Sequence, residues 1–157
     1  MVNWFRRQQP NAAKPTLASL FAALDDPDTA ATLANAGLSE TIRLANDVDY
    51  QVTKGGFAQL LYNLKGEGLS AVEDMLIEVG APRTQDVYVR AITVCLEQQD
   101  EYQRFLAEPF PTPNEVKHSL QLLSIEYFNG PTLPDEAAAW CSTIAAKYRI
   151  AGSGKTA

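Results

Sequence analysis

The side chains with the greatest catalytic potential are one histidine and two cysteines. His118 is the only histidine of the 157 residues, and Cys95 and Cys141 are the only cysteines. A thiol beside an imidazole can act as a nucleophile, so such a pair would suit a small hydrolase or transferase. Both cysteines lie in helical patterns rich in Ala, Ile and Leu, where a free thiol usually packs as a small hydrophobic side chain. The sequence favours buried thiols and a protein that is not an enzyme, and it keeps catalysis as an alternative.

Two other stretches resemble sites for metal ions or phosphate. A single histidine and the absence of paired cysteine spacing give no zinc pattern, so we expect neither a metal nor a cofactor. The aspartates of residues 25–28 fit a turn better than a metal loop, with Asp26 as N-cap and Pro27 in the first helical position. The GSGKT tail resembles the end of a phosphate-binding loop, but Arg149 stands where its first glycine is required.

Acidic side chains form the more informative pattern. Asp74 and Glu78 are spaced as neighbours on one helical face, and Glu97, Asp100 and Glu101 are expected to share another face with a single base, Arg104. Like-charge pairs at this spacing destabilise a helix by about 0.2–0.5 kcal/mol each, a cost that a binding role could offset. These five acids are therefore the candidate contacts for a basic partner, and the alternative is a solvated helix face.

The charge of the whole chain supports the same idea. The net charge is −6, but all 19 acids lie between Asp25 and Glu136, together with only seven of the 13 bases, so this span carries a net −12. Such a surface repels nucleic acid and membranes and attracts basic proteins. No apolar run approaches the ~20 residues of a membrane span. The N-terminus MVNWFRRQQP lacks the central region of a signal peptide, so we expect a cytoplasmic protein.

The elements that must position these residues are helices. Apolar residues recur at helical spacing along most of the chain, and we find no strand-like alternation of useful length. A capping box is expected at Ser70 with Glu73. Asn114 is expected to cap a helix whose apolar positions include Ile125 and Phe128, and one last helix is expected to begin at Pro134. The fold class is all-α, a single compact domain of about seven or eight packed helices over residues 16–150. Residues 1–15 are expected to be a flexible basic segment and residues 151–157 a disordered tail.

Two adjacent glycines interrupt one of these helical patterns. Gly55 and Gly56 each cost about 1 kcal/mol relative to alanine inside a helix, so the pair indicates a sharp redirection of the chain. We expect a positive φ at one of them, and the following helix, which begins near Phe57, to pack back against the preceding one. Gln59, Tyr62 and Asn63 could form a polar contact site beside this turn or satisfy its backbone groups, and the second role is favoured.

The stretch DVDYQVTKGGFAQLLYN and the later EVGAP resemble the bacterial DNA mimic protein nineteen family over about residues 46–110. The coincident positions are Val52, Gly55, Gly56, Phe57, Gln59, Tyr62, Asn63, Gly80 and Ala81. Gln51 and Lys54 depart from the family's usual Glu and Asn. The resemblance implies packed helices, homodimerisation and a role in binding a protein through an acidic surface.

Two binding functions follow from this resemblance and the acidic charge. In the first, the chain inhibits a transcription regulator, nuclease or toxin by occupying its basic, nucleic-acid-binding surface. In the second, it is an immunity protein that neutralises one cognate bacterial toxin, with affinity concentrated in a few buried anchors. Both predict a basic protein as partner, without direct binding to nucleic acid or membrane.

Overall fold

The computed structural model describes residues 13–151, and every regular element in that range is a helix, which confirms the all-α prediction. The helices of this range are α1 (Leu17–Ala23), α2 (Pro27–Asn35), α3 (Ser39–Leu64), α4 (Leu69–Glu78), α5 (Pro82–Glu97), α6 (Gln99–Ala107), α7 (Glu115–Phe128), α8 (Leu133–Glu136) and α9 (Ala138–Lys147). Residues 1–12 and 152–157, which hold most of the expected N-terminal segment and tail, lie outside the described residues.

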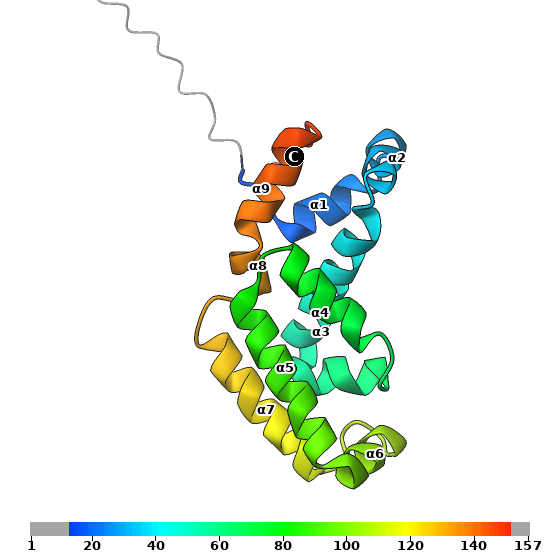
Figure 1. Cartoon of the computed structure of the whole chain (residues 1–157), viewed down its shortest axis with the longest axis vertical. Coiled ribbons are helices and arrows are strands. Elements are labelled where there is room, and N and C mark those ends of the chain that lie inside the picture. The colour runs from blue at the N-terminus through cyan, green and yellow to red at the C-terminus, as the bar shows by residue number, and fades with distance from the viewer. Residues whose placement is uncertain (1–12, 152–157) are drawn as a thin grey trace, which may run out of the picture.

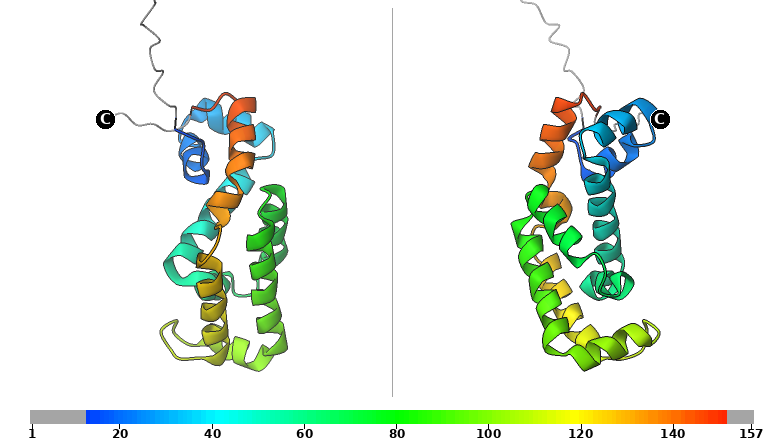
Figure 2. Two further views of the ribbon diagram at one scale, coloured as in Figure 1. Left: turned by 90° about the vertical axis from the view of Figure 1, so that its left-hand side faces the viewer. Right: turned by 45° about the vertical axis from the view of Figure 1, so that its right-hand side comes forward.

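Helix α3 is central to the packing, since it contacts α1, α2, α4 and α7. Helices α1, α2 and α9 gather at one end of the molecule and α6 lies at the other, while α5 and α7 run side by side between them (Figures 1 and 2). The buried core is continuous through this arrangement and includes the large side chains Leu20, Ile42, Phe57, Tyr88 and Tyr127. Helix α3 is therefore the element whose direction decides where the others lie.

Side-chain caps fix several helix starts. Asp26 accepts a hydrogen bond from the third backbone N–H of α2, and Asn114 does so for α7, as expected from the sequence. The capping box expected at Ser70 and Glu73 is wrong, because α4 begins one residue before Ser70. Gly68 stands at that cap with φ 64°, a left-handed conformation that favours glycine and that provides no side-chain acceptor.

The double glycine kinks α3, as the sequence predicts. Gly55 has φ −148° and ψ 18°, and Gly56 has the positive φ of 69°. A Cβ atom added at Gly56 would lie 2.3 Å from the Ser124 hydroxyl oxygen on α7. The same hydroxyl accepts a hydrogen bond of 2.9 Å from the Phe57 N–H and donates one to the Leu120 carbonyl. The kink thus brings α3 against α7, whereas the sequence had suggested close packing between the two halves of α3.

The buried face of α7 differs from the expected one. Ile125 and Phe128, predicted as core positions, are 62% and 48% exposed, while Ser124 and Tyr127 are buried. Ser124 occupies a core position because it supplies the hydroxyl that the kink of α3 requires. The last predicted helix is also divided, into α8 and α9, at Ala137.

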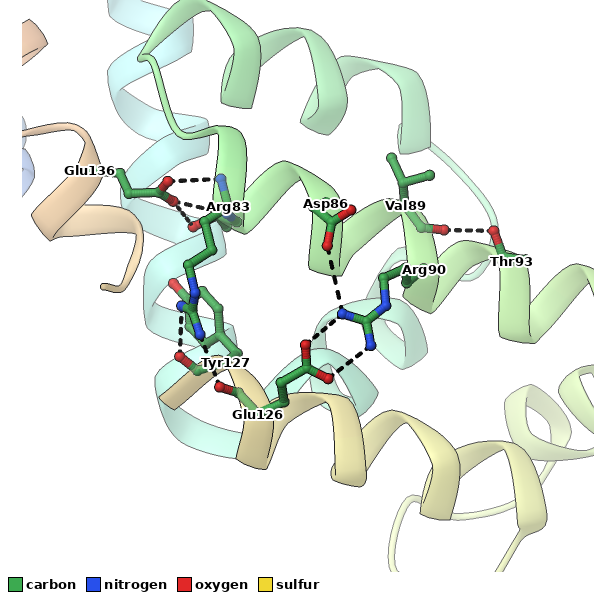
Figure 3. A network of polar contacts seen from close by, with 9 residues as sticks. Arg83, Asp86, Val89, Arg90, Thr93, Glu126, Tyr127 and Glu136 are labelled. Atoms are coloured by element: carbon green, nitrogen blue, oxygen red, sulfur yellow. Dashed lines mark hydrogen bonds and ion pairs between the residues drawn. The ribbon is translucent and has the colours of Figure 1, made fainter. Parts of the chain in front are cut away.

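A reciprocal capping arrangement joins α5, α7 and α8 (Figure 3). The Glu136 carboxylate accepts hydrogen bonds from the N–H groups of Arg83 and Thr84, both 2.8 Å, and from the Thr84 hydroxyl at 2.6 Å. The Arg83 guanidinium donates to three carbonyls at and beyond the end of α7, those of Glu126 (2.9 Å), Tyr127 (2.9 Å) and Pro131 (2.6 Å). The first N–H groups and last carbonyls of helices lack partners within the helix, and this Arg83–Glu136 junction provides them.

A bidentate ion pair links α5 and α7 a turn or two away from the junction. The Arg90 guanidinium donates to both carboxylate oxygens of Glu126, at 2.6 and 2.8 Å, and lies 3.6 Å from Asp86 (Figure 3). We call the Phe57–Ser124 contact, the Arg83–Glu136 junction and the Arg90–Glu126 pair the α7 framework.

Candidate functional site

An open groove of about 550 Å³ lies between the first half of α3 and α4. Its lining residues are Glu40, Thr41, Arg43, Leu44 and Asp47 from α3 and Ala71, Asp74, Met75 and Glu78 from α4. Thr41, near the start of α3, donates a 2.9 Å hydrogen bond to Glu78, at the end of α4. The two helices therefore run antiparallel along this α3–α4 groove.

The two walls of the groove have matching patterns. Four lining residues on each helix fall at i, i+3, i+4 and i+7, which is one face of an α-helix. In each wall the i+4 position is apolar, Leu44 in α3 and Met75 in α4, and the i+7 position is acidic, Asp47 and Glu78. The result is an apolar floor with carboxylates on the rim.

The rim carboxylates have no cationic partner among residues 13–151. The ion pairs of that range involve Arg90 and Arg104, and neither contacts the groove. Four carboxylates face one guanidinium here, that of Arg43, which leaves a net charge of −3. Asp47 and Glu78 accept hydrogen bonds only from the neutral donors Gln51 and Thr41. The negative charge of the groove is therefore available to a ligand.

The placement of acids on α4 is unfavourable for the helix itself. Asp74 and Glu78 are exposed and lie in the C-terminal half of α4, whose last turn contains no basic residue. The macrodipole favours cations at that end, by roughly 0.3–1 kcal/mol per charge. Helix stability alone would favour the opposite charge, so these acids do not stabilise α4 through its dipole.

The second predicted acidic cluster is arranged differently. Gln98, with φ −123° and ψ 55°, separates α5 from α6, so Glu97 does not share a helical face with Asp100 and Glu101. The i, i+4 spacing assumed for Glu97 and Glu101 is broken there. Glu101 pairs with Arg104 and also accepts from the Asn114 amide, so its charge is partly used within the fold. The partner-binding role of these three residues stays a prediction.

The family-motif residues make contacts inside the fold. The Tyr62 hydroxyl donates 2.8 Å to the Glu108 carbonyl, and its ring packs on Phe105 and Phe110. Asn63 donates to Gln51 across the kink of α3, at 2.9 Å. Gln59 lies against Gly55, where a Cβ atom would meet its side chain at 2.6 Å. Tyr62 and Asn63 bond to Glu108 and Gln51 and not to backbone groups of the kink, so the role of satisfying that backbone stays a prediction.

The structure gives the imagined Cys–His dyad no support. Cys95 and Cys141 are buried, and burial raises the pKa of their thiols to about 12 and about 11, which disfavours the nucleophilic thiolate. His118 is exposed beside a shallow polar cleft whose lining contains Arg104 and Lys117 but neither cysteine. Among the described residues no group of His, Cys, Asp and Glu is arranged to hold a metal ion.

Sequence reasoning found the α4 wall of the groove and missed the α3 wall. Glu40, Arg43, Leu44 and Asp47 carry the same spacing as the α4 residues, and that repetition was the available signal. This repetition could not show that the lining faces of α3 and α4 meet, because the hydrogen-bonded pair Thr41 and Glu78 is 37 residues apart in the chain.

Fold and groove together define a small all-helical protein with an open, acidic groove. The family model described as "DMP19-like protein" matches residues 36–145, and the chain belongs to this family. The match confirms the resemblance and extends it beyond residues 46–110 at both ends. No curated protein and no solved structure gives a match.

Family membership implies a DNA-mimic protein, in a family that is generally non-catalytic. It also suggests that the partner is a DNA-binding protein. Within residues 13–151, no helix combines the length and apolar character that crossing a bilayer requires.

Proposed function

We propose that this protein is a non-enzymatic inhibitor that occupies the nucleic-acid-binding surface of a basic protein, and that the α3–α4 groove makes the contact. The observation that carries the proposal is the set of four rim carboxylates without a cationic partner among the described residues. On the α4 wall Asp74 and Glu78 lie on successive turns, about 5–6 Å apart at Cβ. On the α3 wall Glu40 and Asp47 are two turns apart, with Arg43 between them. A nucleic-acid strand also offers spaced negative charges to a basic surface.

Direct binding to nucleic acid is disfavoured by the same charges. The span from Asp25 to Glu136 carries a net −12, and the groove itself carries a net −3. Phosphates are attracted to clustered Lys and Arg, and they are repelled by a surface of this sign. The chain is thus suited to replace nucleic acid on a partner.

The experiment that tests this function compares two double substitutions of equal charge. The immobilised chain is used to capture proteins from a lysate of its native host, and captured proteins are then challenged with duplex DNA. We expect a nucleic-acid-binding protein that DNA displaces, that Asp74→Asn with Glu78→Gln fails to retain, and that Glu97→Gln with Asp100→Asn retains. All four positions are exposed, so folding is spared.

Two results would contradict the proposal. A captured partner that duplex DNA does not displace would contradict the proposal that the chain mimics DNA. Loss of capture by the Glu97 and Asp100 substitutions, with the groove variant unaffected, would move the interface to the end of the molecule near α6.

A further inference from the structure

The floor of the α3–α4 groove is apolar, which charge mimicry does not require. Leu44, Ala71 and Met75 lie between the two acidic rims, and they make the groove more apolar than polar at its base. A surface that only imitates phosphates could be polar throughout. Apolar side chains at the base of an open groove can be covered by apolar surface of a ligand, which gains free energy from that burial.

The length of the groove limits what can enter. The first and last lining positions of each wall are seven residue steps apart, which is about 10 Å at the rise of an α-helix. Acids stand at both ends of this distance. Glu40 and Glu78 lie at one end, where the Thr41 bond joins the helices, and Asp47 lies at the other, while Asp74 is one turn from Glu78 on α4. The floor between them offers room for one anchoring side chain.

The walls also select the backbone conformation of an occupant. Both are helices whose backbone groups bond internally, so the groove has no strand edge to pair with an extended segment. An extended segment would leave backbone N–H and C=O groups without partners against the apolar floor, whereas a helix satisfies its own. Basic residues one turn before and one turn after an anchor on a helix lie roughly 10–12 Å apart, which matches the distance between the acidic ends.

We propose that the α3–α4 groove binds a basic amphipathic helix of the partner, with one large apolar side chain seated between Leu44 and Met75 and Lys or Arg on the flanking turns. This inference rests on the proposed function and specifies the occupant of the same site. Charge complementarity sets the flanking contacts, with Glu40 and Glu78 at one end, Asp47 at the other and Asp74 between them on α4. The apolar anchor supplies the part of the affinity that salt does not screen.

The test uses three labelled synthetic peptides of about 18 residues, long enough for partial helicity. The first carries Arg on the turns before and after a central Leu. The second has Ser in place of that Leu, and the third moves the Leu two residues along, to another face of the helix, at constant composition. We expect the first peptide to bind the full chain about tenfold or more tighter than the others, since burying one apolar side chain contributes on that scale. Its advantage should persist from about 50 mM to about 300 mM salt.

A groove-filling substitution provides the matched variant. Ala71→Trp places a large side chain on the groove floor without changing any charge, and Ala31→Trp does the same at an exposed alanine of α2 outside the groove. We expect Ala71→Trp to remove the advantage of the first peptide and Ala31→Trp to leave it intact. Circular dichroism melts verify that both variants fold. If one of them does not, the comparison of the three peptides on the unsubstituted chain still tests the proposal.

The outcomes separate this inference from the function on which it rests. Equal binding of all three peptides, lost on Asp74→Asn with Glu78→Gln but unaffected by Ala71→Trp, would overturn the anchored helix and leave the acidic interface standing. Peptide binding that is indifferent to Asp74→Asn with Glu78→Gln would overturn both, because the groove would then not be the interface.

Discussion

The α7 framework and the α3–α4 groove use the same residue types in opposite ways. In the framework, Glu136 and Arg83 bind backbone groups at helix ends, and Glu126 binds Arg90 in a bidentate pair. In the groove, Asp74 and Glu78 stand at the helix end where the dipole disfavours them, and among residues 13–151 neither forms an ion pair. A carboxylate satisfied within the fold contributes to stability, whereas the groove carboxylates are the ones that we propose for recognition of a partner.

Helix α3 belongs to both regions. Its first half forms a wall of the groove, and its kink at Gly55 and Gly56 contacts α7. Substitutions in the framework should therefore change the free energy of unfolding and leave binding by the folded fraction intact. Substitutions in the groove should do the reverse.

The largest effect on stability is expected at the kink. Gly56→Ala places a Cβ atom 2.3 Å from the Ser124 hydroxyl and forces a side chain into positive φ, which together should cost about 3 kcal/mol. Gly37→Ala is the matched control, because Gly37 has a similar φ of 73° with nothing within 4 Å, and it should lose only about 1 kcal/mol. Urea unfolding of the two variants measures the difference. Equal losses would mean that the contact with α7 adds nothing.

The Arg83–Glu136 junction should give the next largest effect. Glu136→Gln replaces one acceptor oxygen by an amide that faces N–H donors, so we expect a loss of about 2 kcal/mol. Glu67→Gln, at an exposed loop position, removes the same charge and should change stability by less than about 0.5 kcal/mol. Thermal melts compare the two, and indistinguishable melts would remove the junction from the framework.

The groove should respond in the opposite direction. Asp74→Asn with Glu78→Gln relieves a like-charge pair and an unfavourable dipole contact, so stability should hold or rise by roughly 0.5 kcal/mol. Association with a basic partner should slow and become less dependent on salt, because surface charges act mainly through steering. Stopped-flow on-rates at two ionic strengths measure this, with Asp25→Asn and Glu67→Gln as the control of equal charge. A groove variant that loses stability would show that these acids serve the fold.

The smallest effect is expected for the exposed Arg90–Glu126 pair, and it depends on pH. The hydrogen bond from Arg90 lowers the pKa of Glu126 below its ordinary value of 4.5. A carboxyl whose pKa is lower in the folded state stabilises the fold above its unfolded pKa, and that contribution is lost as the pH falls through the folded pKa. Arg90→Met should therefore lower the melting temperature slightly at pH 7, less than Glu136→Gln does. The two chains should converge once the pH has fallen below the folded pKa of Glu126. A difference that persists in acid would point to lost packing of the Arg90 side chain.

Local features were predictable because they depend on neighbours in the chain. Helical periodicity predicted the all-α fold. The residue types at Asp26 and Asn114 predicted two helix caps, and the glycine pair predicted the kink in α3. The errors arose where tertiary contacts outweighed local preference. Ser124 is buried and Ile125 exposed because the kink of α3 needs a hydroxyl partner on α7.

The sequence by itself determined the helices, the redirection at Gly55 and Gly56, the excess of acidic residues and the family resemblance. Only the tertiary structure decided which acids lie together. Spacing within a helix fixes the face that a residue occupies, so Asp74 and Glu78 could be paired from the sequence alone. Whether that face meets Glu40 and Asp47 depends on how α4 packs against α3, and this packing is set by burial of the core shared between the helices.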